Sequence, residues 1–246
     1  MENIIILIFY HYLNLKLIMN KILIIAAHPD DDILGCGGLM SKYRNQIEFK
    51  VIFIAEGSSC RFDKNDIEGK NIKKIISKRN SFGIEALNSL GVKNYHFYNL
   101  PCGRLDQVPI IEINKIIEKE INNFKPDTVF THSSNDTNND HLIVHRATQM
   151  ATRPGAKTFV EKLYTYEILS STEWRFTKTF LPNYFESLSK TDVENKWLAL
   201  EKYISEIKKY PYPRSREGVF TLSKYRGIQS ANRFAEAFRL IREIKR

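Results

Sequence analysis

The stretch KILIIAAHPDDDILGCGGLM, residues 21–40, decides the fold. It opens with a short continuous apolar run at residues 21–27, which is typical of a parallel strand buried on both faces. A polar turn follows, and residues 32–44 are predicted to form a helix. A buried strand that leads through a turn into a helix is the repeating unit of an α/β fold.

Strand-like and helix-like patterns alternate along the rest of the chain. The predicted strands lie at residues 48–57, 92–100, 128–132 and 162–170. The predicted helices lie at residues 67–90, 110–124, 141–152 (capped by Asp140) and 192–209, before a Pro-rich turn and a last helix. This alternation predicts a Rossmann-like α/β fold, a three-layer sandwich in which helices cover both faces of a mostly parallel sheet.

The composition suits one ordinary globular domain, expected at residues 19–246. The apolar content is 43% and the charged content 26%, values that argue against both disorder and a membrane protein. Residues 1–18 are expected to be an extension of uncertain status, with Met19 favoured as the natural start, because the apolar run there is too short to span a membrane. Three cysteines without a Cys-x-x-Cys pair favour a reducing cytoplasm.

The net charge of +9 has two explanations. It suits an anionic partner such as a sugar nucleotide, an acidic glycan, nucleic acid or a membrane surface. Solvated faces of lysine-rich helices, such as NIKKIISKRN at residues 71–80, explain the same charge, and we favour them for most of the lysines. Because the sequence has no nucleic-acid-binding signature, we expect neither a nucleic-acid partner nor stable membrane insertion.

The first constellation of polar side chains is His28, Asp30 and Asp31, directly after the first strand. Ligands of parallel sheets bind beyond the carboxyl ends of the strands, so this position is a candidate site. Crowded carboxylates and an imidazole at a strand end are costly unless a cation compensates them. Helix capping explains one Asp but not the whole group. We therefore favour a metal site here over a capping turn.

The second constellation, THSSNDTNNDHLIVH at residues 131–145, lies at another strand end and enters the next helix. His141 is a candidate ligand. His145, four residues further on and on the same helix face, is either a rival ligand or a partly buried helix histidine, and the residues alone leave both open. His132 is either a donor that supports the ligands or a loop residue, and we favour the loop residue. Two His and one carboxylate with open positions are the usual donor set for catalytic zinc, and the same set also suits non-haem Fe²⁺.

These two segments resemble the PIG-L/LmbE family of metal-dependent N-deacetylases. The family's AHPDD(E/D) motif stands here at residues 27–32, and its Asp-His pair at Asp140-His141. The resemblance extends over most of the chain from about residue 20 and includes NLPCGRLDQVP, YPYPRS and RFAEAFRLIR, which are similar to a bacterial subgroup associated with surface-polysaccharide or sugar-nucleotide pathways. It implies that His28, Asp31 and His141 bind the metal and that Asp30 is the general base.

One position departs from the family pattern. Many members carry a His three residues before the ligand His, where this chain has Asn138. Asn can donate a hydrogen bond to an oxyanion but cannot deliver a proton, so we expect Asn138 to be catalytic while the general acid stays open between Asp30, His132 and His145.

The implied function is removal of the acetyl group from an N-acetylated sugar, free, nucleotide-linked or in a glycan precursor. Arg61 and then Arg104 are the expected substrate-binding residues, with Arg153 and Arg214 as further candidates, because guanidinium groups suit phosphate and carboxylate. The resemblance also leaves a homo-oligomer open. Two rival functions remain: an S-adenosylmethionine-dependent methyltransferase, suggested by Gly35-Cys36-Gly37-Gly38, and a related amidase acting on a non-sugar amide.

Overall fold

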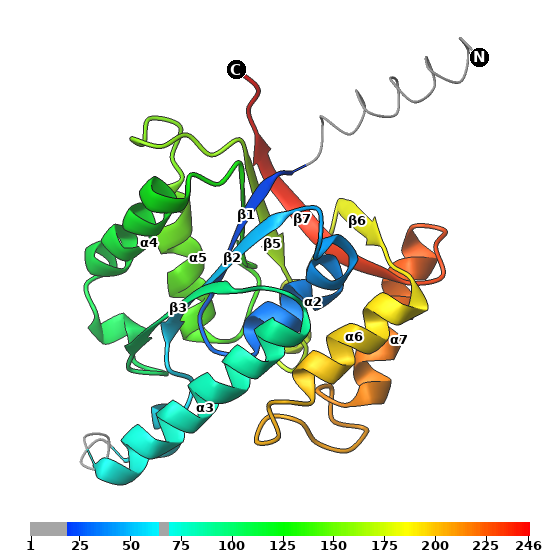
Figure 1. Cartoon of the computed structure of the whole chain (residues 1–246), viewed down its shortest axis with the longest axis horizontal. Helices are drawn as coiled ribbons and strands as arrows, with labels where there is room; N and C mark the ends of the chain where they lie inside the picture. The colour runs from blue at the N-terminus through cyan, green and yellow to red at the C-terminus, as the bar shows by residue number, and fades with distance from the viewer. Residues whose placement is uncertain (1–18, 64–68) are drawn as a thin grey trace.

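The structure is a computed structural model that describes residues 19–63 and 69–246. The expected extension at residues 1–18 therefore lies outside the described residues. Seven strands form one sheet in the order β3-β2-β1-β4-β5-β7-β6 (Figure 1). Their bounds are β1 Lys21–Ala26, β2 Glu48–Ala55, β3 Asn94–Leu100, β4 Thr128–His132, β5 Lys162–Tyr166, β6 Tyr184–Ser187 and β7 Ala235–Glu243. β1 to β5 pair in parallel, whereas β7 runs antiparallel to both β5 and β6.

Helices cover both faces of this sheet. Their bounds are α2 Asp31–Tyr43, α3 Lys70–Ser89, α4 Ile110–Phe124, α5 Asn139–Ala151, α6 Lys190–Leu200 and α7 Arg216–Gln229. α4 and α5 lie on one face, and α2, α3, α6 and α7 on the other (Figure 1). The predicted α/β three-layer sandwich is confirmed. Within the described residues, no helix has the length and apolar character that a membrane crossing requires.

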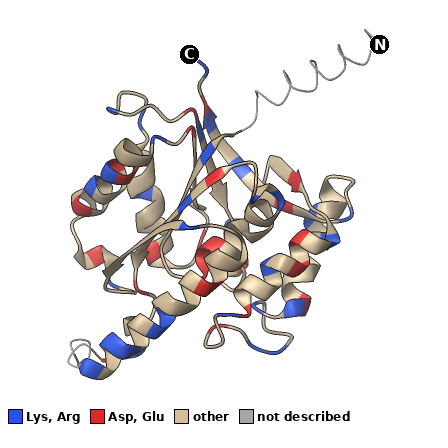
Figure 2. Ribbon diagram, in the orientation of Figure 1, with Lys and Arg blue, Asp and Glu red and all other residues tan. Residues whose placement is uncertain are grey.

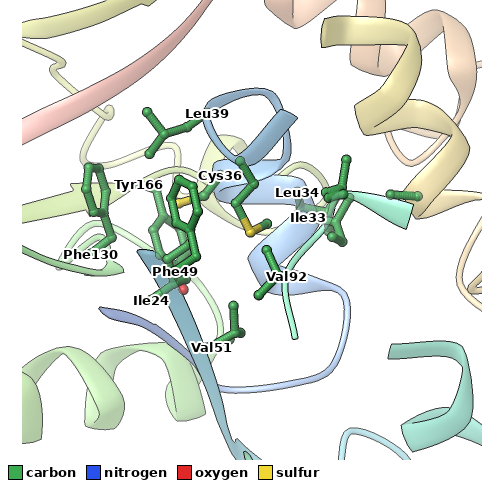
Figure 3. Packing of buried hydrophobic residues seen from close by; sticks show 14 of the residues in the cluster. Ile24, Ile33, Leu34, Cys36, Leu39, Phe49, Val51, Val92, Phe130 and Tyr166 are labelled. Carbon is green, nitrogen blue, oxygen red and sulfur yellow. The ribbon is translucent and has the colours of Figure 1, made fainter. Parts of the chain in front are cut away.

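The sheet divides the core into two halves, and the interior strand β1 contributes side chains to both. Ile22 and Ile24 point into the half under α2, while Leu23 and Ile25 point into the half under α4 and α5. Because successive side chains of a strand face opposite ways, a continuous apolar run is needed when both faces are covered. Figure 3 shows the half under α2, where Ile24 lies among side chains from α2, β2, β4 and β5.

The glycines of α2 allow other side chains to approach the helix closely. A Cβ atom on Gly35 would lie 2.5 Å from the ring of Tyr166, and one on Gly38 would lie 2.4 Å from Leu188. The space beside Gly38 also admits the carboxylate of Glu236, which accepts hydrogen bonds from the backbone N–H groups of Gly38 and Leu39, both at 2.7 Å. Close packing therefore accounts for the glycine run that suggested a methyltransferase.

The C-terminal third differs from the prediction. The predicted helix at residues 192–209 ends at Leu200, after which the chain turns so that Tyr203 is buried and Glu206 reaches Arg79. The sequence pattern also does not predict β6 and β7. β6 has only four residues, and the apolar positions of β7 fit a helical period as well as an extended one.

The lysine-rich faces are largely solvated, as expected. Lys73, Lys74 and Lys78 of α3 are exposed, and Figure 2 shows basic residues along the outer part of this helix. Arg79, the next residue, is the exception, because it is buried beneath the helix.

Replacing Glu236 with Ala is expected to lower the free energy of unfolding by about 3–5 kcal/mol. The change removes the partner of the buried Lys196 ammonium, which lies 2.8 Å from the Glu236 carboxylate. Urea unfolding followed by circular dichroism measures the loss. Glu243→Ala on the same strand is the control, since its ion pairs are solvated and contribute at most about 1 kcal/mol. Equal effects of the two variants would contradict the role assigned to Glu236.

Candidate metal centre

Two polar segments far apart in the sequence meet at the carboxyl edge of the sheet. His28 lies two residues after the end of β1, and His132 is the last residue of the neighbouring strand β4. Asp31 begins α2, and His141 lies in the first turn of α5. Because parallel neighbours end at the same edge, the topology alone brings these side chains together, as the sequence predicts.

The three predicted metal ligands form one buried group. The Oδ2 atom of Asp31 lies 3.3 Å from Nδ1 of His28 and 3.3 Å from Nε2 of His141. Ligand atoms of all three side chains lie within 4.8 Å of one another, and each residue is at most 6% exposed. The structure thus brings His28, Asp31 and His141 to a single point.

A further carboxylate contacts the outward nitrogen of each imidazole. Nε2 of His28 lies 2.9 Å from Oδ2 of Asp140, and Nδ1 of His141 lies 3.2 Å from Oδ2 of Asp136. Carboxylates in this position orient metal-binding imidazoles and make them better donors. The sequence analysis assigned neither Asp to this role, although both lie in the His- and Asp-rich segment that it singled out.

The donor atoms fit a divalent cation. Asp31 Oδ1 and both ring nitrogens of His141 are buried and make no hydrogen bond of acceptable geometry within the described residues. Such atoms cost free energy unless something binds them. Imidazole nitrogen and carboxylate oxygen are normal ligands of Zn²⁺ and Fe²⁺. The centre therefore suits a metal ion by its chemistry as well as its geometry.

The carboxylates also attract protons to the two imidazoles. Burial alone would lower the pKa of His28, but hydrogen bonds to Asp140 and Asp31 raise it to about 10. Burial likewise opposes the charge of His141, yet the neighbouring carboxylates of Asp31 and Asp136 raise its pKa to about 9. A metal cation that replaces these protons would be attracted by the same carboxylate charges.

The other two histidines are held by the backbone. Nε2 of His132 accepts a hydrogen bond from the Ala27 N–H at 2.8 Å, and its ring stacks on His141. Nδ1 of His145 donates to the His132 carbonyl at 2.9 Å. His132 is thus a buried strand residue and not the predicted loop residue. His145 contacts the end of β4 through this bond.

Asn138, and not Asp140, caps α5. The Asn138 Oδ1 atom accepts from the Asp140 N–H at 2.9 Å, so the Asp140 side chain is free to contact His28. The prediction that Asp140 is the N-cap is therefore wrong. Asn meets the cap requirement equally well, and its amide nitrogen stays available as a donor.

Asp30 lies between the buried Arg79 and the partly buried Arg214. Its Oδ2 atom is 2.5 Å from Arg214 and its Oδ1 atom 3.2 Å from Arg79. Burial raises the pKa of Asp30 to about 6, while Arg214 and Arg79 oppose that rise. The residue also has a φ of 120°, a strained value for a side-chain-bearing residue. Neighbouring structure therefore fixes this carboxylate beside the ligand group.

The predicted substrate-binding arginines Arg61 and Arg104 contact residues around the candidate metal centre and not the three candidate ligands themselves. Arg61 pairs with Glu206 at 2.8 Å and is about half exposed, while Arg104 contacts backbone carbonyls of the adjoining loops. Arg153 pairs with Glu118, at the other end of α5. Arg214, the remaining candidate, is the one that contacts Asp30.

The sequence analysis missed Arg79 and Glu206. Arg79 donates to the Pro29 carbonyl at 2.8 Å and pairs with Glu206, which also binds Arg61. Helical spacing from the buried Ile72 was a usable signal, because position 79 lies on the same face of α3. Glu206 had no such signal, since it lies in an irregular segment.

The chain is similar to known proteins in both sequence and structure. The family model PIG-L, described as GlcNAc-PI de-N-acetylase, matches residues 23–152. Uncharacterized deacetylase YaiS of Escherichia coli K12 is 28% identical over 188 residues, which are 75% of this chain and 90% of that protein.

Two solved structures show the same fold. N,N'-diacetylchitobiose deacetylase from Pyrococcus horikoshii has a TM-score of 0.73 at 20% identity and covers 91% of this chain and 84% of its own. GalB, the 4-carboxy-2-hydroxymuconate hydratase of Pseudomonas putida, has a TM-score of 0.69 at 18% identity and covers 93% of this chain and 98% of its own. Because one is a deacetylase and the other a hydratase, the fold alone does not set the reaction.

The match to the family model gives evidence of family membership as well as of fold. It spans more than half of the chain and includes both polar segments of the centre. The chain therefore belongs to the PIG-L family of deacetylases.

Proposed function

We propose that the protein is a metal-dependent hydrolase that removes the acetyl group from an N-acetylated sugar of the GlcNAc type, either nucleotide-linked or in a glycan precursor. The observation that carries the proposal is the buried donor set of His28, Asp31 and His141 with the Asp30 carboxylate fixed beside it. Family membership and the relatives' names, a chitobiose deacetylase among them, support a sugar amide over a non-sugar amide.

His28, Asp31 and His141 would hold Zn²⁺, or alternatively Fe²⁺. A bound ion of this kind polarises the acetyl carbonyl and lowers the pKa of a water molecule. Asp140 and Asp136 keep the two imidazoles in position from behind. The three cysteines are free, which supports the cytoplasm as the site of action.

Asp30 would act as the general base. Its carboxylate takes the proton from the attacking water and returns it to the departing amine nitrogen. Arg79 and Arg214 contact different oxygens of Asp30 and so fix its orientation. We favour Asp30 over His132 and His145 as the group that returns the proton. His132 already accepts a hydrogen bond from the backbone, and His145 already donates one to it.

Asn138 would stabilise the charge that develops on the acetyl oxygen. Its Oδ1 atom is committed to the Asp140 N–H, which leaves the Nδ2 atom to donate outward. Arg61 and Arg104 would bind hydroxyl or anionic groups of the substrate.

Two aromatic residues would complete the substrate site. The rings of Trp174 and Tyr212 pack edge to face. Trp174 lies near Thr172, which contacts Asp136, and Tyr212 lies near Arg214, which contacts Asp30. The two rings would offer an apolar surface to a sugar ring.

Replacing Asp30 with Asn should lower kcat by about 10²–10⁴-fold, because the shape is kept and the base is lost. Acetate release from N-acetyl sugars and sugar nucleotides measures the activity, and elemental analysis checks that metal content stays at the wild-type level. Asp106→Asn, at an exposed position of the short 3₁₀ helix Leu105–Gln107, is the control. Loss of metal together with activity would make Asp30 a ligand instead.

Replacing Arg61 with Ala is expected to raise KM about tenfold with little change in kcat, since one charged hydrogen bond to the substrate is lost. Glu206 keeps Arg79 as a partner, so the fold should survive. Steady-state kinetics separates the two parameters. Arg153→Ala, at the other end of α5, should behave as wild type. A KM unchanged in Arg61→Ala would remove Arg61 from the substrate site.

The metal-free protein should lose stability as the pH rises from 6.5 toward 10. The folded-state pKa values of His28 and His141 are raised, to about 10 and about 9, so their stabilising contribution is complete below pH 6.5 and disappears as the folded state loses the protons. Thermal unfolding of chelator-treated protein tests this. His28→Asn should lose less stability over this interval than the wild-type protein. His96→Asn, which changes an exposed histidine, should lose as much as the wild-type protein. A stability that rises between pH 6.5 and 10 would show that protonated His28 and His141 do not stabilise the metal-free protein.

A further inference from the structure

A second set of metal-binding atoms lies on the opposite side of the His28 ring. Ligand atoms of His28, Cys102 and Asp140 lie within 4.8 Å of one another, and all three residues are buried. The first set meets His28 at Nδ1, whereas Asp140 meets it at Nε2. We propose that His28, Cys102 and Asp140 form a second cation site, which takes a thiophilic divalent ion such as Zn²⁺, Cd²⁺ or Co²⁺.

The donors of this site are positioned before any ion binds. The Asp140 carboxylate accepts from the backbone N–H groups of Gly103 at 2.6 Å and Leu105 at 3.2 Å. The N–H of Cys102 donates to Glu56 at 2.9 Å, which fixes the start of the same loop. Gly103 has a φ of +71°, a conformation that glycine adopts readily and that lets the loop turn tightly around Asp140.

The chemistry of the three donors selects the ion. Nitrogen, oxygen and sulfur ligands together suit Zn²⁺ and its softer relatives, whereas Mg²⁺ and Ca²⁺ require oxygen. Binding displaces one proton from the Cys102 thiol and one from the His28 ring, and both are released to solvent. One thiolate and one carboxylate then balance the charge of a divalent ion. Simple burial of Cys102 as a small apolar residue explains its packing but not its approach to His28 and Asp140.

The two sites share His28, and this has a consequence for the enzyme. An ion at the second site takes the Nε2 atom and the Asp140 oxygen that otherwise contact each other at 2.9 Å. The carboxylate then no longer orients His28 toward Asp31 and His141 directly. Excess thiophilic metal is therefore expected to inhibit the proposed deacetylation by loading the second site.

Titration of the metal-free protein with Co²⁺ tests the proposal by absorption spectroscopy. The first set has no sulfur atom, so a thiolate-to-cobalt charge-transfer band in the near ultraviolet cannot come from it. We expect the wild-type protein to develop this band as cobalt rises above one ion per chain. Cys102→Ser should lose the band while still binding cobalt at the first set. Cys36→Ser, which changes a buried thiol on α2, should keep it.

A second variant guards against misfolding and separates the two sites. His141→Ala removes a ligand of the first set only, so the thiolate band should persist while total cobalt falls. Cobalt bound without any thiolate band would overturn the second site and leave the proposed function intact. A band that survives in Cys102→Ser would also overturn it, and the absence of any cobalt binding would overturn both proposals.

Discussion

One carboxylate oxygen, Oδ2 of Asp31, connects the polar segments on which the centre depends. It accepts from the His28 N–H at 2.8 Å and lies 3.3 Å from the rings of both His28 and His141. A buried carboxylate is stable only where neighbours compensate its charge. The paired ends of β1 and β4 supply that compensation, because they carry the two imidazole-bearing segments to the same edge of the sheet.

A second group of charges connects this edge to the C-terminal third of the chain. Glu206 and Arg214 come from the irregular segment between α6 and α7, and they meet Arg79 and Asp30. Removing one partner would leave a buried charge unpaired, which typically costs about 3–5 kcal/mol. These charges fix the Asp30 carboxylate. They also hold the C-terminal third of the chain against the edge of the sheet that carries the candidate metal centre, so the fold and the site depend on the same contacts.

Much of this arrangement could be predicted because it follows from local patterns. The apolar run at residues 21–27 identifies a doubly covered strand, and the polar residues after it identify the ligand edge. The role of Glu206 could not be predicted, because it depends on a turn after Leu200 that no local propensity dictates. The pairing of Asp140 with His28 likewise depends on contacts between residues 112 positions apart. Sequence patterns identify the proposed metal ligands, whereas the residues that orient them emerge only from tertiary contacts.

The most direct test of the metal centre is elemental analysis of the purified protein beside His141→Ala, a variant that affects the first donor set alone. We predict about one zinc or iron ion per chain in the wild-type protein, strongly reduced in His141→Ala and retained in the exposed control His96→Ala. Equal metal content in His141→Ala, or none in the wild-type protein after incubation with zinc, would contradict the assignment of His28, Asp31 and His141 as the metal centre.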